Sequence, residues 1–192
     1  MDTPRDGLKE IFSSIQGEGC RAGVPSIFVR FAGCNMACRK STHGFDCDTD
    51  FSGGTRLSLG ELIDRIAEVS FGHSSIILTG GEPALQVDAA LIERLKACGW
   101  YVAIETNGTI ALPPGIDWIT VSPKTPEHTL RQRVANEVKY VLADEQPLPR
   151  PSIEGATRLL SPAFRGEELD PAALAWCVKL CLANPGWRLS VQ

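Results

Sequence analysis

The chain has 192 residues, a length typical of one domain with its own core, and we expect a single domain over residues 1–192. Its 19 Lys and Arg against 23 Asp and Glu give a net charge of −4, which argues against a general nucleic-acid-binding surface. No apolar run reaches the ~18 residues of a membrane helix. The first ten residues carry no signal-peptide pattern, so we expect a cytosolic protein that does not bind membranes.

Strand and helix patterns alternate along the chain. Apolar strands are predicted at 26–31, 75–79, 100–106, 117–122, 136–142 and 187–191, and helices at 57–69, 84–99 and 171–183. Ser58 and Asp170 are suitable N-caps, Pro171 suits a first helical position, and Gly99 ends the middle helix. This alternation predicts an α/β fold with a mainly parallel sheet, whose ligands bind beyond the carboxyl ends of the strands.

Three of the seven cysteines fall in one short window. Cys34 and Cys38 are separated by three residues, and Cys38 and Cys47 by eight polar and turn-forming residues that can loop out. In a reducing compartment such a cluster indicates metal or redox chemistry rather than disulfides. Three thiolates can hold an iron–sulfur cluster with one open iron. A closed zinc site needs a fourth ligand, which His43 could supply, so these residues alone leave both interpretations open.

The other cysteines have simpler interpretations. Cys177 and Cys181 lie one turn apart in an apolar helical pattern, where we expect them to pack in the core. We expect Cys98, at the end of a predicted helix, to pack as well. Cys20 lies in a glycine-rich loop and is expected to be partly exposed.

Polar and glycine-rich motifs follow the predicted strands in a specific order. The segments AGCNMAC…CDT, TGGEP, ETNG and SPK together resemble the radical S-adenosylmethionine superfamily. The segments EIFSSIQGEG, VRFAGCN, CDTDF and NEVK resemble, within it, the 7-carboxy-7-deazaguanine synthase family. The resemblance runs from about Glu10 to the end of the sequence. It implies an incomplete parallel (β/α)6-type barrel of about six strands, with cluster and active site at the C-terminal ends of the strands.

The resemblance also implies a reaction. The family are lyases that convert 6-carboxy-5,6,7,8-tetrahydropterin to 7-carboxy-7-deazaguanine with loss of ammonia, in queuosine and 7-deazapurine biosynthesis. An adenosyl radical, formed from S-adenosylmethionine at a [4Fe–4S] cluster, removes hydrogen from the substrate, and no side chain acts as acid or base. The protein positions the reactants and shields the radical. A homodimer and a reducing electron donor of the flavodoxin or ferredoxin type are implied as partners.

Residue roles carry over by position from the resemblance. Cys34, Cys38 and Cys47 would hold the cluster, and Thr49 would bind a Mg²⁺ shared with the substrate. The substrate-binding residues would be Ile15, Gln16, Gly17, Arg30 and Thr79. The residues binding S-adenosylmethionine would be Asp46, Asp48, Gly81, Ser122, Pro123 and Lys124. Arg30 has the planar fork that suits a substrate carboxylate, and the two glycines at 80 and 81 allow close approach of the backbone to the cosubstrate.

Some residues keep two interpretations. Glu18 could bind the pterin or brace its own loop, and ligand contact cannot be separated from loop bracing for Glu105 and Asn107. Without the resemblance, Thr49 would be read as a turn residue and Lys124 as a solvated charge.

The sequence departs from the family pattern in three places. Eight residues, not two, separate Cys38 from Cys47. Ser161-Pro162 stands where relatives carry Gln-Pro, and the family usually continues past Gln192 with a Thr-His-Lys segment. We expect either a truncated sequence or a pocket closed differently, as by a second subunit.

Two other functions compete with this one. A glycyl-radical activase would have no use for the QGEG motif or for a Mg²⁺ site at Thr49. A structural zinc module using three cysteines and His43 would leave TGGEP, ETNG and SPK without a purpose.

Overall fold

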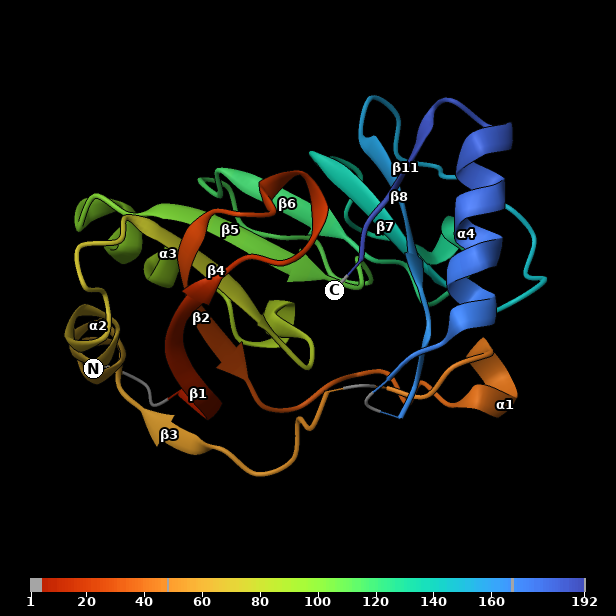
Figure 1. Cartoon of the computed structure of the whole chain (residues 1–192). Helices are drawn as coiled ribbons and strands as arrows, with labels where there is room; N and C mark the ends of the chain where they lie inside the picture. Colours follow the sequence, from red (N-terminus) through yellow and green to blue (C-terminus); the bar gives the residue numbers. More distant parts are fainter. Residues whose placement is uncertain (1–4, 48, 167, 192) are drawn as a thin grey trace.

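The computed structural model describes residues 5–47, 49–166 and 168–191, arranged around one nine-stranded sheet (Figure 1). Its strands are β1 (Arg5–Ile15), β2 (Pro25–Phe31), β3 (Thr55–Leu57), β4 (Ser75–Gly80), β5 (Tyr101–Thr106), β6 (Trp118–Val121), β7 (Glu137–Leu142), β8 (Thr157–Pro162) and β11 (Trp187–Leu189). A separate pair is formed by β9 (Phe164–Arg165) and β10 (Glu168–Leu169). The helices are α1 (Lys40–His43), α2 (Leu59–Glu68), α3 (Ala89–Ala97) and α4 (Pro171–Ala183), with 3-10 turns η1 (Gly19–Arg21), η2 (Pro83–Leu85) and η3 (Glu127–Thr129).

The sheet order is β11-β8-β7-β6-β5-β4-β2-β1-β3. Seven neighbouring strands, β2, β4, β5, β6, β7, β8 and β11, are mutually parallel. Beyond β2, β1 pairs with β2 in antiparallel fashion, and β3 pairs with β1 in the same way. The two outer strands, β11 and β3, are not neighbours. The predicted α/β fold and incomplete barrel are therefore confirmed, with seven parallel strands among the described residues where about six were expected.

Local sequence signals explain where the helices begin and end. The Ser58 hydroxyl accepts the amide proton of Glu61, whose carboxylate accepts that of Ser58, so α2 begins with a complete capping box. Asp170 caps α4 ahead of Pro171. The chain leaves α3 through Gly99, which has a positive φ of 83°. These three predicted boundaries are confirmed. None of the helices in the described ranges is long and apolar enough to cross a membrane.

Five of the described strands are missing from the sequence prediction: β1, β3, β8, β9 and β10. The polar residues of β1 hide the period-two pattern, and this strand is recognised only through its pairing with β2 on one side and β3 on the other. β8 ends in Pro162, which resembles a loop signal. The expectation for Cys98 is wrong, because its side chain is exposed where α3 ends, whereas Cys177 is buried and Cys181 and Cys20 are partly buried.

Side chains alternate between the two faces of the parallel strands. On one face, Leu78 of β4 and Ile104 of β5 are fully buried and pack with α2 and α3 in one apolar cluster. On the other face the next residues, Thr79 and Glu105, are polar. A second cluster joins β6, β7 and β8 to α4, including the buried Cys177. The helices thus leave the opposite, inner face of the sheet to polar groups.

A buried carboxylate ties together the loops that follow β4 and β5. Glu82, which is fully buried, accepts hydrogen bonds from the Ala84 amide, the Thr106 hydroxyl and the Asn107 amide at 2.6–3.0 Å. Asn107 in turn donates to Asn35, in the loop that carries Cys34 and Cys38. Three donors compensate much of the cost of burying this carboxylate. The TGGEP and ETNG motifs are therefore held in fixed relation to the cysteine loop.

The apolar cluster on α2 and α3 predicts a large core effect. Leu78→Ala is expected to lower the free energy of unfolding by about 3–5 kcal/mol, because it leaves a cavity in a fully buried site. Urea denaturation of the metal-free protein measures this change. Leu182→Ala is the matched control: its side chain is 80% exposed, and a change within about 0.5 kcal/mol is expected. Equal effects of the two substitutions would contradict this core.

Glu82 predicts a pH-dependent contribution to stability. Burial raises the pKa of Glu82, so the folded state holds this proton more tightly than the unfolded state does. The contribution of Glu82 to stability therefore falls as the pH rises from about 4.3, the ordinary value, through the folded-state pKa. Since Glu82→Gln does not titrate, the difference in unfolding free energy between wild type and variant should shrink over this range. Urea denaturation at several pH values tests this, and a difference that grows with pH would contradict it.

Candidate functional site

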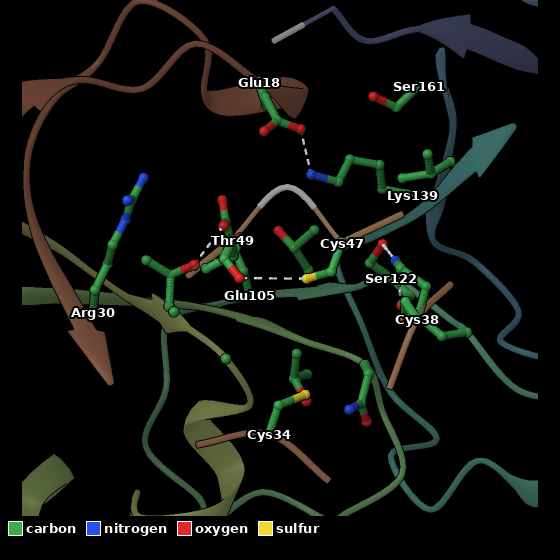
Figure 2. A pocket seen from close by; sticks show the side chains of 18 of the residues that line it. Glu18, Arg30, Cys34, Cys38, Cys47, Thr49, Glu105, Ser122, Lys139 and Ser161 are labelled. Carbon is green, nitrogen blue, oxygen red and sulfur yellow. Dashed lines mark hydrogen bonds and ion pairs between the residues drawn. The ribbon is translucent and has the colours of Figure 1, made fainter. Parts of the chain in front are cut away.

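A cavity of about 430 Å³ lies on the inner face of the sheet, near the carboxyl ends of the parallel strands (Figure 2). Its walls are formed by these strands, by residues 14–18 at the end of β1, and by the loop after β2 that carries the three clustered cysteines. The volume is within the range of small-molecule sites. The sequence prediction that ligands bind at this edge of the sheet agrees with the position of the cavity.

Each of six neighbouring strands contributes a polar side chain to this cavity. From the β2 side to the β8 side they are Arg30, Thr79, Glu105, Thr120, Lys139 and Ser161. They project from the inner face because residues one position away, such as Val138 and Tyr140, occupy the outer apolar cluster. The cavity wall is therefore a row of hydrogen-bonding and charged groups on a rigid support.

The structure brings together nearly all the residues predicted for the site. The cavity is lined by Ile15, Gln16, Gly17, Arg30, Cys34, Cys38, Asp46, Cys47, Thr49, Thr79, Gly81, Ser122 and Lys124. Pro123 is buried and is not among the lining residues that the structure describes. Asp48 lies outside the described residues. Glu18, Glu105, Asn107 and Ser161, whose roles the sequence left open, also line the cavity.

The cysteine loop presents three thiols to one cavity. Cys34 and Cys38 are partly buried and Cys47 is exposed. Burial raises the pKa of the Cys34 thiol, although the Met36 amide donates to its sulfur at 3.4 Å and acts in the opposite direction. Within the described ranges, no three His, Cys, Asp or Glu side chains lie close enough together to hold a metal ion. The thiols therefore surround a common space without converging on one point.

The donor set nevertheless fits an iron–sulfur cluster. Three sulfur ligands from a single loop are the type of ligand that iron–sulfur clusters use, and a cluster is larger than a single ion. His43 does not support the zinc alternative. Its Nδ1 contacts the Thr42 hydroxyl at 2.7 Å and the Arg39 amide at 3.3 Å, and His43 is not part of the described lining of the cavity.

Arg30 is held in place by β1. Its Nη1 donates to Glu10 Oε1 at 3.0 Å, and its guanidinium lies 5.3 Å from the centre of the Phe12 ring. The side chain remains 40% exposed. A half-exposed ion pair of this kind is weak, because water screens it, so Arg30 can exchange Glu10 for an incoming anion.

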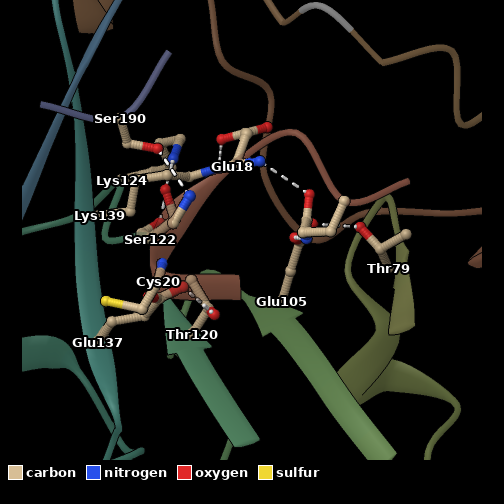
Figure 3. Close-up of polar contacts among 12 residues, drawn as sticks. Glu18, Cys20, Thr79, Glu105, Thr120, Ser122, Lys124, Glu137, Lys139 and Ser190 are labelled. Carbon is tan, nitrogen blue, oxygen red and sulfur yellow. Dashed lines mark hydrogen bonds and ion pairs between the residues drawn. The ribbon is translucent and has the colours of Figure 1, made fainter. Parts of the chain in front are cut away.

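Glu105 is the centre of a polar network in the cavity wall (Figure 3). Its two carboxylate oxygens accept hydrogen bonds from Gln16 Nε2 and from the Thr79 hydroxyl, each at 2.9 Å. These contacts join β4, β5 and the chain after β1. Gln16 and Thr79, both predicted to bind substrate, are therefore oriented by the same carboxylate.

Lys139 is a cavity residue that the sequence prediction missed. Its ammonium forms an ion pair with the Glu18 carboxylate, and each side chain is 13% exposed. The alternation within residues 137–142 contains the signal, because Glu137 and Lys139 alternate with Val138 and Tyr140. The partner could not be read from that pattern, since Glu18 lies 121 residues away in the sequence.

The glycines at the end of β4 also have a structural reason within the chain. A Cβ at Gly81 would lie 2.0 Å from the Gly33 carbonyl oxygen, and one at Gly80 would lie 2.3 Å from that of Phe31. Glycine is therefore required because the loops after β2 and β4 are in close contact. Nearby, Lys124 Nζ donates to the Ser122 hydroxyl at 2.6 Å and to its carbonyl at 3.1 Å.

Comparisons with known proteins identify the family of the chain. The family model for the radical SAM superfamily matches residues 28–142. A 7-carboxy-7-deazaguanine synthase of Bradyrhizobium diazoefficiens is 43% identical over 202 residues, which cover 96% of this chain and 94% of that protein. One of Bacteroides thetaiotaomicron is 41% identical over 185 residues, which cover 96% and 93% of the two chains.

A solved structure extends the comparison to three dimensions. The crystal structure of QueE from Escherichia coli superimposes with a TM-score of 0.71 at 25% sequence identity, covering 98% of this chain and 94% of that one. The chain therefore belongs to the radical S-adenosylmethionine superfamily and, within it, to the 7-carboxy-7-deazaguanine synthase family.

Proposed function

We propose that this chain is a lyase that converts 6-carboxy-5,6,7,8-tetrahydropterin to 7-carboxy-7-deazaguanine, the reaction that supplies queuosine biosynthesis. Family membership supports the reaction. The observation that carries it to this molecule is the cavity, which has three thiols on one side and a row of polar strand residues on the other. A cosubstrate near the thiols and a pterin near the strands would then be neighbours.

We assign the cluster to Cys34, Cys38 and Cys47. When bound, the [4Fe–4S] cluster would supply an electron to S-adenosylmethionine and so provide the adenosyl radical. The chain's own part is to present three thiolates. Because the pKa of Cys34 is raised by burial, its thiol must release a proton when iron binds, so cluster assembly is favoured as the pH rises.

We assign cosubstrate binding to Asp46, Asp48, Gly81, Ser122, Pro123 and Lys124. Lys124 supports this assignment because it lines the cavity and its ammonium donates to the Ser122 hydroxyl. A cation and a hydroxyl side by side suit a carboxylate ligand. Gly81 contributes backbone rather than a side chain, next to the cysteine loop.

We assign substrate binding to Ile15, Gln16, Gly17, Arg30 and Thr79. Arg30 would exchange Glu10 for the substrate carboxylate, which its fork can bind through two hydrogen bonds. A Mg²⁺ held by the Thr49 hydroxyl and by substrate oxygens would neutralise charge at the same place. Gln16 and Thr79, fixed by Glu105, would orient the polar edge of the ring.

Three broader assignments belong to the same proposal. The sheet from β1 to β11 supports a single domain over residues 1–192. We further propose a homodimer, which analytical ultracentrifugation would measure. A small reducing electron carrier of the flavodoxin or ferredoxin type would complete the system.

The cluster assignment predicts the behaviour of two cysteine variants. Cys47→Ala is expected to retain less than about a tenth of the wild-type iron after anaerobic reconstitution, and to form no 7-carboxy-7-deazaguanine, because a cluster needs all its thiolates. Iron analysis, the brown colour and mass spectrometry of the product measure this. Cys98→Ala, which removes an exposed thiol outside the cavity, is the control and should match wild type. A fully active Cys47→Ala would rule out the assignment.

The Mg²⁺ assignment predicts a hydroxyl requirement at position 49. Thr49→Ala should raise the Mg²⁺ concentration for half-maximal activity by about tenfold, since Mg²⁺ prefers oxygen ligands. Thr49→Ser keeps the hydroxyl and should resemble wild type. Product formation across a Mg²⁺ titration measures both variants. Identical Mg²⁺ dependence in Thr49→Ala and wild type would remove the metal from this residue.

A further inference from the structure

The segment that follows β1 is bound to the inner face of the sheet by strands distant in the sequence (Figure 3). Its contacts are Gln16 with Glu105 of β5, Glu18 with Lys139 of β7, the Gly19 amide with the Ser190 hydroxyl after β11, and the Cys20 amide with Glu137 of β7. We call residues 16–20 the entry loop. This loop carries two residues assigned to substrate binding, so its position determines the shape of the cavity.

Glu137 is the most deeply buried partner of this loop. The residue is only 4% exposed and is not part of the described cavity lining. Oε1 accepts the Thr120 hydroxyl and Oε2 accepts the Cys20 amide, each at 2.8 Å. Both oxygens therefore have a donor, one from the sheet and one from the entry loop. A carboxylate is costly to bury, and here it links a strand to a loop rather than filling a core.

Gly19 shows how closely the loop lies on this carboxylate. Its φ is +69°, and a Cβ there would lie 2.4 Å from Glu137 Oε1. A larger residue here would be strained by the backbone conformation and would displace the Glu137 carboxylate. Its amide is also bound at 2.9 Å by the Ser190 hydroxyl.

Lys139 extends the same attachment toward the cavity. It lies two residues after Glu137 and so projects from the same face of β7. Its ion pair with Glu18 is largely shielded from water, with both side chains 13% exposed. Removing one partner of such a pair leaves a poorly solvated charge, so the pair resists separation. β7 therefore holds the entry loop at two points, the Glu18 carboxylate and the Cys20 amide.

We propose that Glu137 is a positioning residue for the pterin, acting through the entry loop and supported by the Lys139–Glu18 ion pair. It fixes the loop at the distance from the sheet where Gln16 reaches Glu105 at 2.9 Å. The substrate part of this inference rests on the proposed function. The attachment of the loop to β7 does not depend on it, and the two parts have separate tests.

Hydrogen–deuterium exchange of the cluster-free protein tests the attachment. Glu137→Gln keeps the shape of the side chain but offers one acceptor oxygen to two donors. Gly19→Ala separates the loop from Glu137 without altering the core. In both variants the amide hydrogens of residues 16–20 should exchange about tenfold faster. The reason is that the loop opens locally more often once its contact with Glu137 is lost. Glu93→Gln, at an exposed position on α3, is the matched control and should leave the exchange unchanged. Unchanged exchange in both test variants would overturn the attachment.

Steady-state kinetics of the reconstituted enzyme test the positioning role. In both variants kcat/KM for 6-carboxytetrahydropterin should fall by about tenfold or more, because a small misplacement of bound substrate is costly. Cleavage of S-adenosylmethionine without pterin, measured as 5′-deoxyadenosine, should stay within about twofold of wild type, since the thiols and Lys124 lie in other loops. An equal loss in both assays would show a general structural defect and overturn the positioning role.

Two further outcomes separate the inference from the proposed function. Faster exchange with unchanged kcat/KM would show that the loop is attached to β7 without positioning substrate, which overturns the positioning role alone. A wild-type enzyme that cleaves S-adenosylmethionine but makes no 7-carboxy-7-deazaguanine would overturn the proposed substrate and, with it, the positioning of that substrate. The exchange result would then still decide whether Glu137 holds the loop.

Discussion

Successive side chains along a β-strand point to opposite faces of a sheet, and the whole molecule depends on this constraint. On the outer face, residues such as Leu78 and Ile104 are buried by α2 and α3. On the inner face, the alternate positions carry one polar residue per strand into a single cavity. Because both faces belong to the same hydrogen-bonded strands, the apolar packing that stabilises the fold also fixes the spacing of the polar groups. The site therefore needs no separate scaffold.

Buried carboxylates then fix the loops that the sheet alone does not hold. Glu82 connects the loops after β4 and β5, and Glu137 connects β6 and β7 to the entry loop. Each is desolvated at a cost, and each recovers part of that cost only if its donors are in place. Movement of either loop would deprive a buried carboxylate of some of its donors. The loops that carry the predicted ligand contacts are thus positioned before any ligand binds, which reduces the ordering cost of binding.

The cysteine loop is the part of the site with the least support from the sheet. Its outer portion consists of the one-turn helix α1 and polar turns, and Cys47 is exposed. The three thiols border one cavity without converging on one point. A bound cluster would connect the three thiolates, and the free energy of cluster binding would then order this loop. Close contact at Gly33 and Gly81 keeps the base of the loop against β4, so only the outer portion has to adjust.

The α/β class, three helix boundaries, the cysteine window and the motifs at the strand ends can be predicted from the amino-acid sequence, because each depends on residues close together in the chain. What lies opposite each motif depends on the packing of segments that are far apart in the chain. The Glu18–Lys139 pair joins residues 121 positions apart, the glycine at 81 is explained by the carbonyl of Gly33, and Cys98 is exposed despite its helical position. Strands β1 and β8 likewise became evident only through their neighbours. Local patterns determine which face a side chain occupies, whereas its partner depends on how distant segments pack.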